Sequence, residues 1–84
     1  MRKPTIHTNG TSAAELYARL EAASHKTMDA LKALEAAYPN GRDYYVQGSD
    51  AIAEAIREHE SRCAAIKGVY NEIGLLLDHV ADSL

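Results

Sequence analysis

Residues 52–80 read IAEAIREHESRCAAIKGVYNEIGLLLDHV, and the spacing of the mostly apolar residues in this stretch decides the fold. These residues recur at alternating steps of four and three, without a slip. A sustained seven-residue repeat of this kind is typical of a helix whose side chains interlock with those of a facing helix. The repeat, here named the seam of the second helix, consists of Ile52, Ile56, His59, Cys63, Ile66, Tyr70, Ile73, Leu77, Val80 and Leu84.

An upstream stretch repeats with the same spacing. Between the two stretches, Pro39 disfavours helical geometry at Tyr38, and Asn40-Gly41 favours a turn. The sequence therefore predicts an all-α fold, an antiparallel two-helix hairpin of the coiled-coil type. The seam of the first helix consists of Ala13, Tyr17, Leu20, Ser24, Thr27, Leu31, Leu34 and Tyr38.

Helix caps and turn residues predict where the elements begin and end. We expect an extended arm over residues 1–10 and the hairpin over 11–84, with helices at 12–37 and 50–82 and a loop at 38–49. Ser12 and Glu15 have the spacing of a capping box, in which hydroxyl and carboxylate each satisfy one free amide of the first turn. Ser49 or Asp50 is the expected cap of the second helix.

Folding the chain back at this loop pairs the two seams layer by layer. The predicted layers are Tyr38 with Ile52, Leu34 with Ile56, Leu31 with His59, Thr27 with Cys63, Ser24 with Ile66, Leu20 with Tyr70 and Tyr17 with Ile73.

The apolar face near the open end of the hairpin is wider than one partner helix covers. Leu16, Val69, Leu75 and Leu76 lie beside the seams. Apolar burial contributes roughly 25 cal/mol per Å², and a chain of 84 residues has little stability to spare. We therefore expect self-association into a homodimeric four-helix bundle.

Composition narrows the functional classes. Cys63 is the only cysteine, so one chain can form no disulfide and no cysteine-based zinc motif, and a reducing compartment is expected. Polar residues follow Met1-Arg2-Lys3, and no apolar run is long enough to cross a bilayer. We expect a cytoplasmic protein without a membrane partner. Nucleic-acid binding is not expected, because no basic cluster exists beyond the arm.

No catalytic pattern is present in the sequence. It contains no nucleophile elbow and no phosphate-binding glycine loop, so we expect neither an enzyme nor a cofactor. His59 and Cys63 lie one helical turn apart and could reach one metal ion. The interpretation favoured is a core pair, with the imidazole bonded to Thr27 or Ser24 across the seam.

Two further patterns have alternative readings. Glu21, His25 and Asp29 form a stripe that could hold a metal, but such stripes are more often solvated faces. Gly68 and Gly74 interrupt the second helix and suggest a close helix approach or a bend, with simple tolerance of glycine as the equal alternative.

The loop is the predicted binding site. Its candidate residues are Arg42, Asp43, Tyr44 and Tyr45. Arginine and tyrosine are enriched at binding hot spots, and tyrosine can stack on a nucleobase while arginine binds phosphate. The structural alternative is that Arg42 and Asp43 brace the loop while one tyrosine folds onto the end of the bundle.

The stretch from Asn9 to Gly48, above all its loop Asn40-Gly41-Arg42-Asp43-Tyr44-Tyr45, resembles a family of short uncharacterised proteins of bacteriophages and prophages. The resemblance implies a small accessory protein in the cytoplasm of a bacterial host, and it assigns no site residues. We expect an oligomeric helical interaction module that binds a host protein. The alternatives are a nucleotide-binding or sequestering protein using Arg42, Tyr44 and Tyr45, and a structural or assembly protein.

Overall fold

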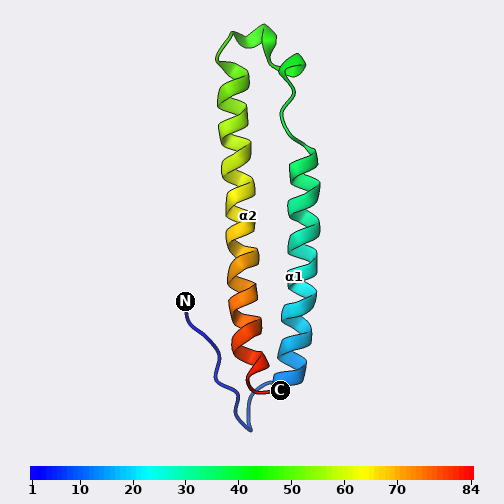
Figure 1. Cartoon of the computed structure of the whole chain (residues 1–84), viewed down its shortest axis with the longest axis vertical. Helices are drawn as coiled ribbons and strands as arrows, with labels where there is room; N and C mark the ends of the chain where they lie inside the picture. The colour runs from blue at the N-terminus through cyan, green and yellow to red at the C-terminus, as the bar shows by residue number, and fades with distance from the viewer.

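Two long helices lie side by side and antiparallel in the computed structural model, which describes residues 1–84 (Figure 1). Helix α1 extends over Ala13–Ala36 and helix α2 over Ala51–Ala81, and two single 3₁₀ turns, η1 (Gly41–Asp43) and η2 (Tyr45–Gln47), lie between them. There is no strand. The predicted all-α hairpin is confirmed.

The core is a single layer between the two helices, and it lies on the predicted seams. Most other seam residues are half-buried, whereas Tyr38 and Leu84 are exposed. The seven-residue repeat therefore identified the contact faces of both helices correctly. The five buried residues of the chain all belong to the seams: Ala13, Ser24, Leu31, His59 and Val80.

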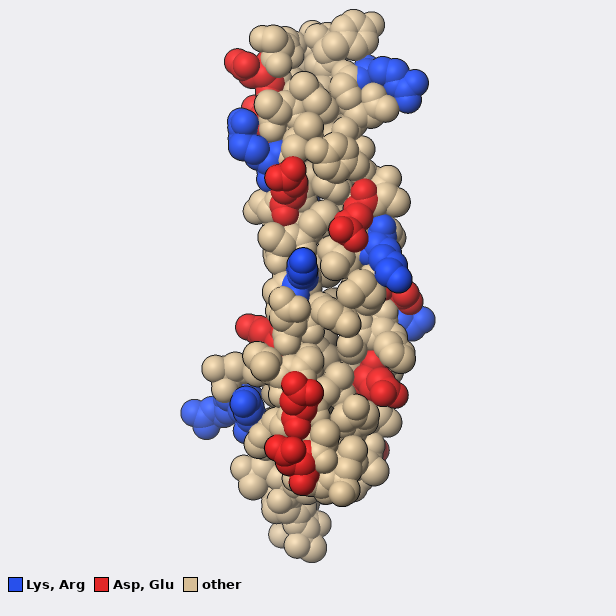
Figure 2. Space-filling view, viewed as in Figure 1, with Lys and Arg blue, Asp and Glu red and all other residues tan.

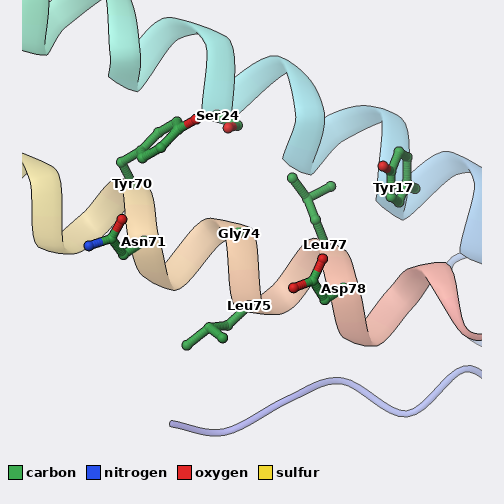
Figure 3. A pocket seen from close by; sticks show the side chains of 8 residues that line it. All are labelled: Tyr17, Ser24, Tyr70, Asn71, Gly74, Leu75, Leu77 and Asp78. Atoms are coloured by element: carbon green, nitrogen blue, oxygen red, sulfur yellow. The ribbon is translucent and has the colours of Figure 1, made fainter.

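The layer pairing predicted from the sequence is wrong by one seven-residue repeat. The ring of Tyr38 lies edge-on to the ring of His59, with centroids 5.6 Å apart, rather than opposite Ile52. In agreement, Leu77 points toward α1 between Ser24 and Tyr17 (Figure 3). This place on α1 lies two seam positions from the one that the predicted pairing gives to Leu77.

The cause of the shift is the segment that follows α1. Helix α1 ends at Ala36, and the chain then rises without helical structure to the loop, so that the first turns of α2 extend beyond the end of α1 (Figure 1). Helix α2 is accordingly the longer helix, with 31 residues against 24. A shift by a whole repeat keeps seam facing seam, which is why the pattern alone does not distinguish the two registers.

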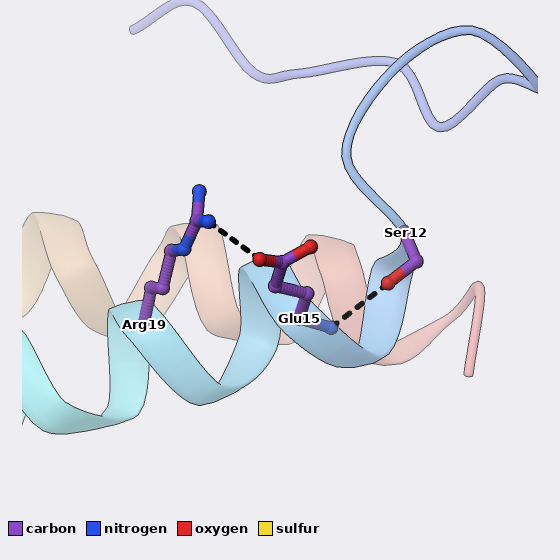
Figure 4. A network of polar contacts seen from close by, with 3 residues as sticks. All are labelled: Ser12, Glu15 and Arg19. Carbon is purple, nitrogen blue, oxygen red and sulfur yellow. Dashed lines mark hydrogen bonds and ion pairs between the residues drawn. The ribbon is translucent and has the colours of Figure 1, made fainter.

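The caps are partly as predicted. The Ser12 hydroxyl accepts a hydrogen bond from the Glu15 amide at 3.1 Å, which fixes the start of α1. The Glu15 carboxylate, however, bonds to Arg19 rather than back to Ser12, so only half of the capping box forms (Figure 4). Asp50 stands at the N-cap of α2, but its side chain makes no capping bond.

The N-terminal arm runs back beside the C-terminal half of α2 (Figure 1). His79 Nε2 donates a hydrogen bond to the Pro4 carbonyl at 2.7 Å, which joins the two ends of the chain. Pro4 and Ile6 are half-buried in this arrangement. Neither helix combines the length and the apolar character that crossing a membrane requires.

Candidate functional site

The predicted binding loop is held in shape by Asn40. Its Oδ1 atom accepts hydrogen bonds from the backbone amide of Arg42 at 2.9 Å and from Arg42 Nε at 3.3 Å. Asn40 thereby caps η1 and orients the base of the guanidinium group. The terminal nitrogens of Arg42 make no bond within the chain, so they are available to an anionic or carbonyl ligand.

Arg42 and Asp43 do not brace each other. The two ion pairs of the structure join Glu15 to Arg19 and Glu58 to Arg62, each one turn apart on an exposed helix surface. Arg42 does brace the loop, as the structural alternative proposed, but its partner is the amide oxygen of Asn40 and not Asp43.

The two adjacent tyrosines have different surroundings. Tyr44 is half-buried, whereas the residues Tyr45 and Val46 are each 76% exposed. Gly48 closes the loop with a φ of +112°, a conformation that residues with a side chain rarely adopt. The loop thus presents Arg42, Asp43 and Tyr45 to solvent, and Tyr44 is the tyrosine that is partly covered.

His59 and Cys63 are brought together, but not with the predicted partners. His59 is only 5% exposed, and its Nε2 atom lies 3.6 Å from Cys63 Sγ. The Thr27 hydroxyl donates to the Ala23 carbonyl of its own helix, and no bond joins the imidazole to Thr27 or Ser24. The expected hydrogen bond across the seam is therefore wrong.

A cavity of about 360 Å³ opens beside this pair. It is lined by Glu35, Tyr38, His59, Glu60 and Cys63. The side chains of the structure form no group of three or more histidine, cysteine, aspartate or glutamate residues that could hold a metal ion. At this end of the seam His59 contacts Cys63 and the edge of the Tyr38 ring.

A second cavity, of about 440 Å³, lies between the other halves of the helices (Figure 3). The sequence reasoning missed it. The available signal is Gly74, for which the sequence leaves close helix approach, a bend and simple tolerance of glycine open. A Cβ atom added at Gly74 or Gly68 would meet nothing within 4 Å, so neither glycine is required by contact between the helices.

Charges of both signs are scattered along the face seen in Figure 2, and lysine and arginine do not gather into one patch there. The stripe of Glu21, His25 and Asp29 is exposed along its whole length and contains no ion pair.

No protein-family model matches the sequence, and no curated protein and no solved structure matches the chain. The resemblance to phage and prophage proteins therefore stays a prediction.

Proposed function

We propose that the hairpin is one half of a homodimeric four-helix bundle, and that this bundle is an interaction module which binds a host protein through its loop. In this proposal the chain is a small phage-type accessory protein of the bacterial cytoplasm that binds rather than catalyses. The observation that supports it best is the surface the single chain leaves exposed.

The accessible surface is 6152 Å² for a chain of 9.1 kDa. A compact monomer of this mass exposes about 4,900 Å², so this hairpin exposes roughly 1,250 Å² more. A stable interface covers about 800 Å² on each partner. The radius of gyration is 18.5 Å, whereas a compact domain of this length has roughly 12 Å. The larger value has the same cause, because the two helices form only one layer.

One side of the hairpin suits a second copy. In an antiparallel pair of helices, the residue before every second seam residue projects to one side of the hairpin. This side is the same for both helices. Here they form an apolar strip, which ends at the Arg62–Glu58 ion pair. Val69, within this strip, is 51% exposed. The strip consists of Leu16, Ala23, Ala30, Val69 and Leu76.

We propose that the partner protein binds at the loop end of the hairpin. It combines a guanidinium with free donors, a carboxylate and the exposed ring of Tyr45, and such residues dominate binding energy at protein interfaces. Its shape is fixed by Asn40, so little conformational entropy is lost when a partner binds.

Sedimentation equilibrium tests the dimer. The wild-type chain is expected at twice its monomer mass, and Val69→Glu at the monomer mass, because the new carboxylate would be buried in the interface without a partner. Ala64→Glu is the matched control, since it adds the same charge to an exposed position on the other side of α2. Monomeric wild type, or dimeric Val69→Glu, would contradict the proposal.

Affinity purification from bacterial lysate tests the loop. Wild-type protein is expected to retain a specific host protein that Arg42→Ala with Tyr45→Ala loses, while both forms keep the same mass. Retention of the same protein by the double variant would refute the role of the loop.

The second candidate is a small-ligand protein that binds nucleotides. The free guanidinium of Arg42 and the exposed ring of Tyr45 at one tip favour it, because they suit a phosphate and a base respectively. A tight nucleotide must raise the melting temperature. A screen of mono- and cyclic dinucleotides that produces no shift at millimolar concentration removes this candidate.

A further inference from the structure

The cavity of about 440 Å³ between α1 and α2 lies away from the loop and on the opposite side of the hairpin from the apolar strip. Its lining residues are Tyr17, Ser24, Tyr70, Asn71, Gly74, Leu75, Leu77 and Asp78. Figure 3 shows Tyr70 leaning toward Ser24 at one end, with Tyr17 and Asp78 toward the other. Gly74 lies between the two ends and leaves the middle of the cavity open.

The charge that lines this cavity is negative only. Asp78 contributes a carboxylate, and no lysine, arginine or histidine lines the cavity. Asp78 takes part in neither ion pair of the chain, so no cationic side chain lies within ion-pair distance of it. The hydroxyls and the Asn71 carboxamide add oxygen acceptors, and tyrosine ring faces attract cations.

Ser24 is a second, independent indication of a ligand. It is 9% exposed, yet its side chain makes no hydrogen bond within the chain. Its hydroxyl therefore keeps a free donor and a free acceptor for a molecule in the cavity. No side-chain oxygen or nitrogen is sealed off without a partner, so the Ser24 hydroxyl stays reachable from the cavity.

We propose that this cavity binds an organic cation, an alkylguanidinium or alkylammonium group. Asp78 pairs with the charge beside the ring of Tyr17, and the alkyl chain crosses the gap at Gly74 beside Leu77 toward Tyr70 and Ser24 at the other end. The inference depends on neither the dimer nor the loop. A free amine and an arginine side chain of a partner protein share this chemistry.

NMR titration of the full chain with propylguanidinium tests the site. Saturable shifts are expected at the amides of Ser24, Asn71 and Gly74. Propylurea, which has nearly the same shape without the charge, is expected to cause none. Asp78→Asn should weaken binding about tenfold, since hydrogen bonds to charged groups are the stronger ones, and Asp82→Asn is the control carboxylate outside the cavity.

Gly74→Leu separates loss of the site from loss of the fold. The leucine would fill the open middle of the cavity, so binding should disappear while helicity and melting temperature are kept or raised. Gly68→Leu places the same side chain at an open position outside the cavity and should leave binding unchanged.

A five-residue peptide with a central arginine distinguishes the two sources of the cation. Binding at least tenfold tighter than propylguanidinium would assign the cavity to a basic segment of a protein, and equal affinity would assign it to a small free cation. Absence of saturable shifts, equal binding of propylurea, or full binding by Gly74→Leu would overturn the proposal. None of these results would affect the mass or the partner retention that test the proposed function.

Discussion

Gly48 is the residue whose backbone the loop depends on most directly. Its φ of +112° lies in a region that only glycine adopts at low cost, and it closes the second 3₁₀ turn before α2 begins. Gly48→Ala is expected to lower the free energy of unfolding by about 1–3 kcal/mol, measured by urea denaturation.

Gly41 is the matched control for this change. It has no positive φ, and a Cβ atom there meets nothing within 4 Å. Gly41→Ala should therefore leave stability nearly unchanged. Equal effects of the two substitutions would mean that the conformation of Gly48 is not required.

Ser12 fixes the start of α1 through a single hydrogen bond to the Glu15 amide. Ser12→Ala is expected to cost about 1 kcal/mol of stability, because the amide loses its partner. Thr11→Ala is the control, since Thr11 is exposed and caps nothing. A urea midpoint for Ser12→Ala equal to that of Thr11→Ala would show that water replaces the cap without loss.

Single residues also show how far local patterns predict structure. The Ser12 cap and the turn at Asn40-Gly41 depend on neighbours within a few positions, and the sequence predicted both. The bond from Arg42 Nε to Asn40 Oδ1 was not predicted, because sequence proximity does not decide which acceptor a flexible guanidinium reaches.

At the scale of elements, the arm and α2 are joined by the bond from His79 to the Pro4 carbonyl. His79→Phe keeps the ring but removes the donor, so we expect the arm to become mobile and stability to fall by about 1 kcal/mol. Amide relaxation by NMR should report order parameters below about 0.6 over residues 1–7.

The control for the arm is His25→Phe, because His25 is exposed on α1 and makes no hydrogen bond. An arm that stays equally ordered in both variants would mean that the half-buried Pro4 and Ile6 hold it without His79.

At the scale of the whole molecule, the proposed dimer links stability to concentration. Only folded chains associate, so raising the concentration a hundredfold should stabilise the fold by up to about 2.7 kcal/mol per dimer, about 1.4 kcal/mol per chain, and raise the melting temperature. Val69→Glu should melt at a temperature independent of concentration. Scanning calorimetry over this range makes the comparison, and a concentration-independent wild type would count against the dimer.

The sequence by itself determined the two helices, the face by which each packs on the other and the position of the turn. These features follow from a seven-residue repeat and from proline, asparagine and glycine chemistry, which act over short distances. Every buried residue lies on a seam that the repeat identifies.

The tertiary structure decided the register and, with it, both cavities. Sliding one helix by a whole repeat leaves every seam residue facing the other seam, so the pattern has no preference between Ile52 and His59 as the neighbour of Tyr38. The choice comes from how far the chain travels after Ala36 before α2 begins. Long-range geometry of that kind also places Ser24, Gly74 and Asp78 around one cavity, which no spacing within either helix could indicate.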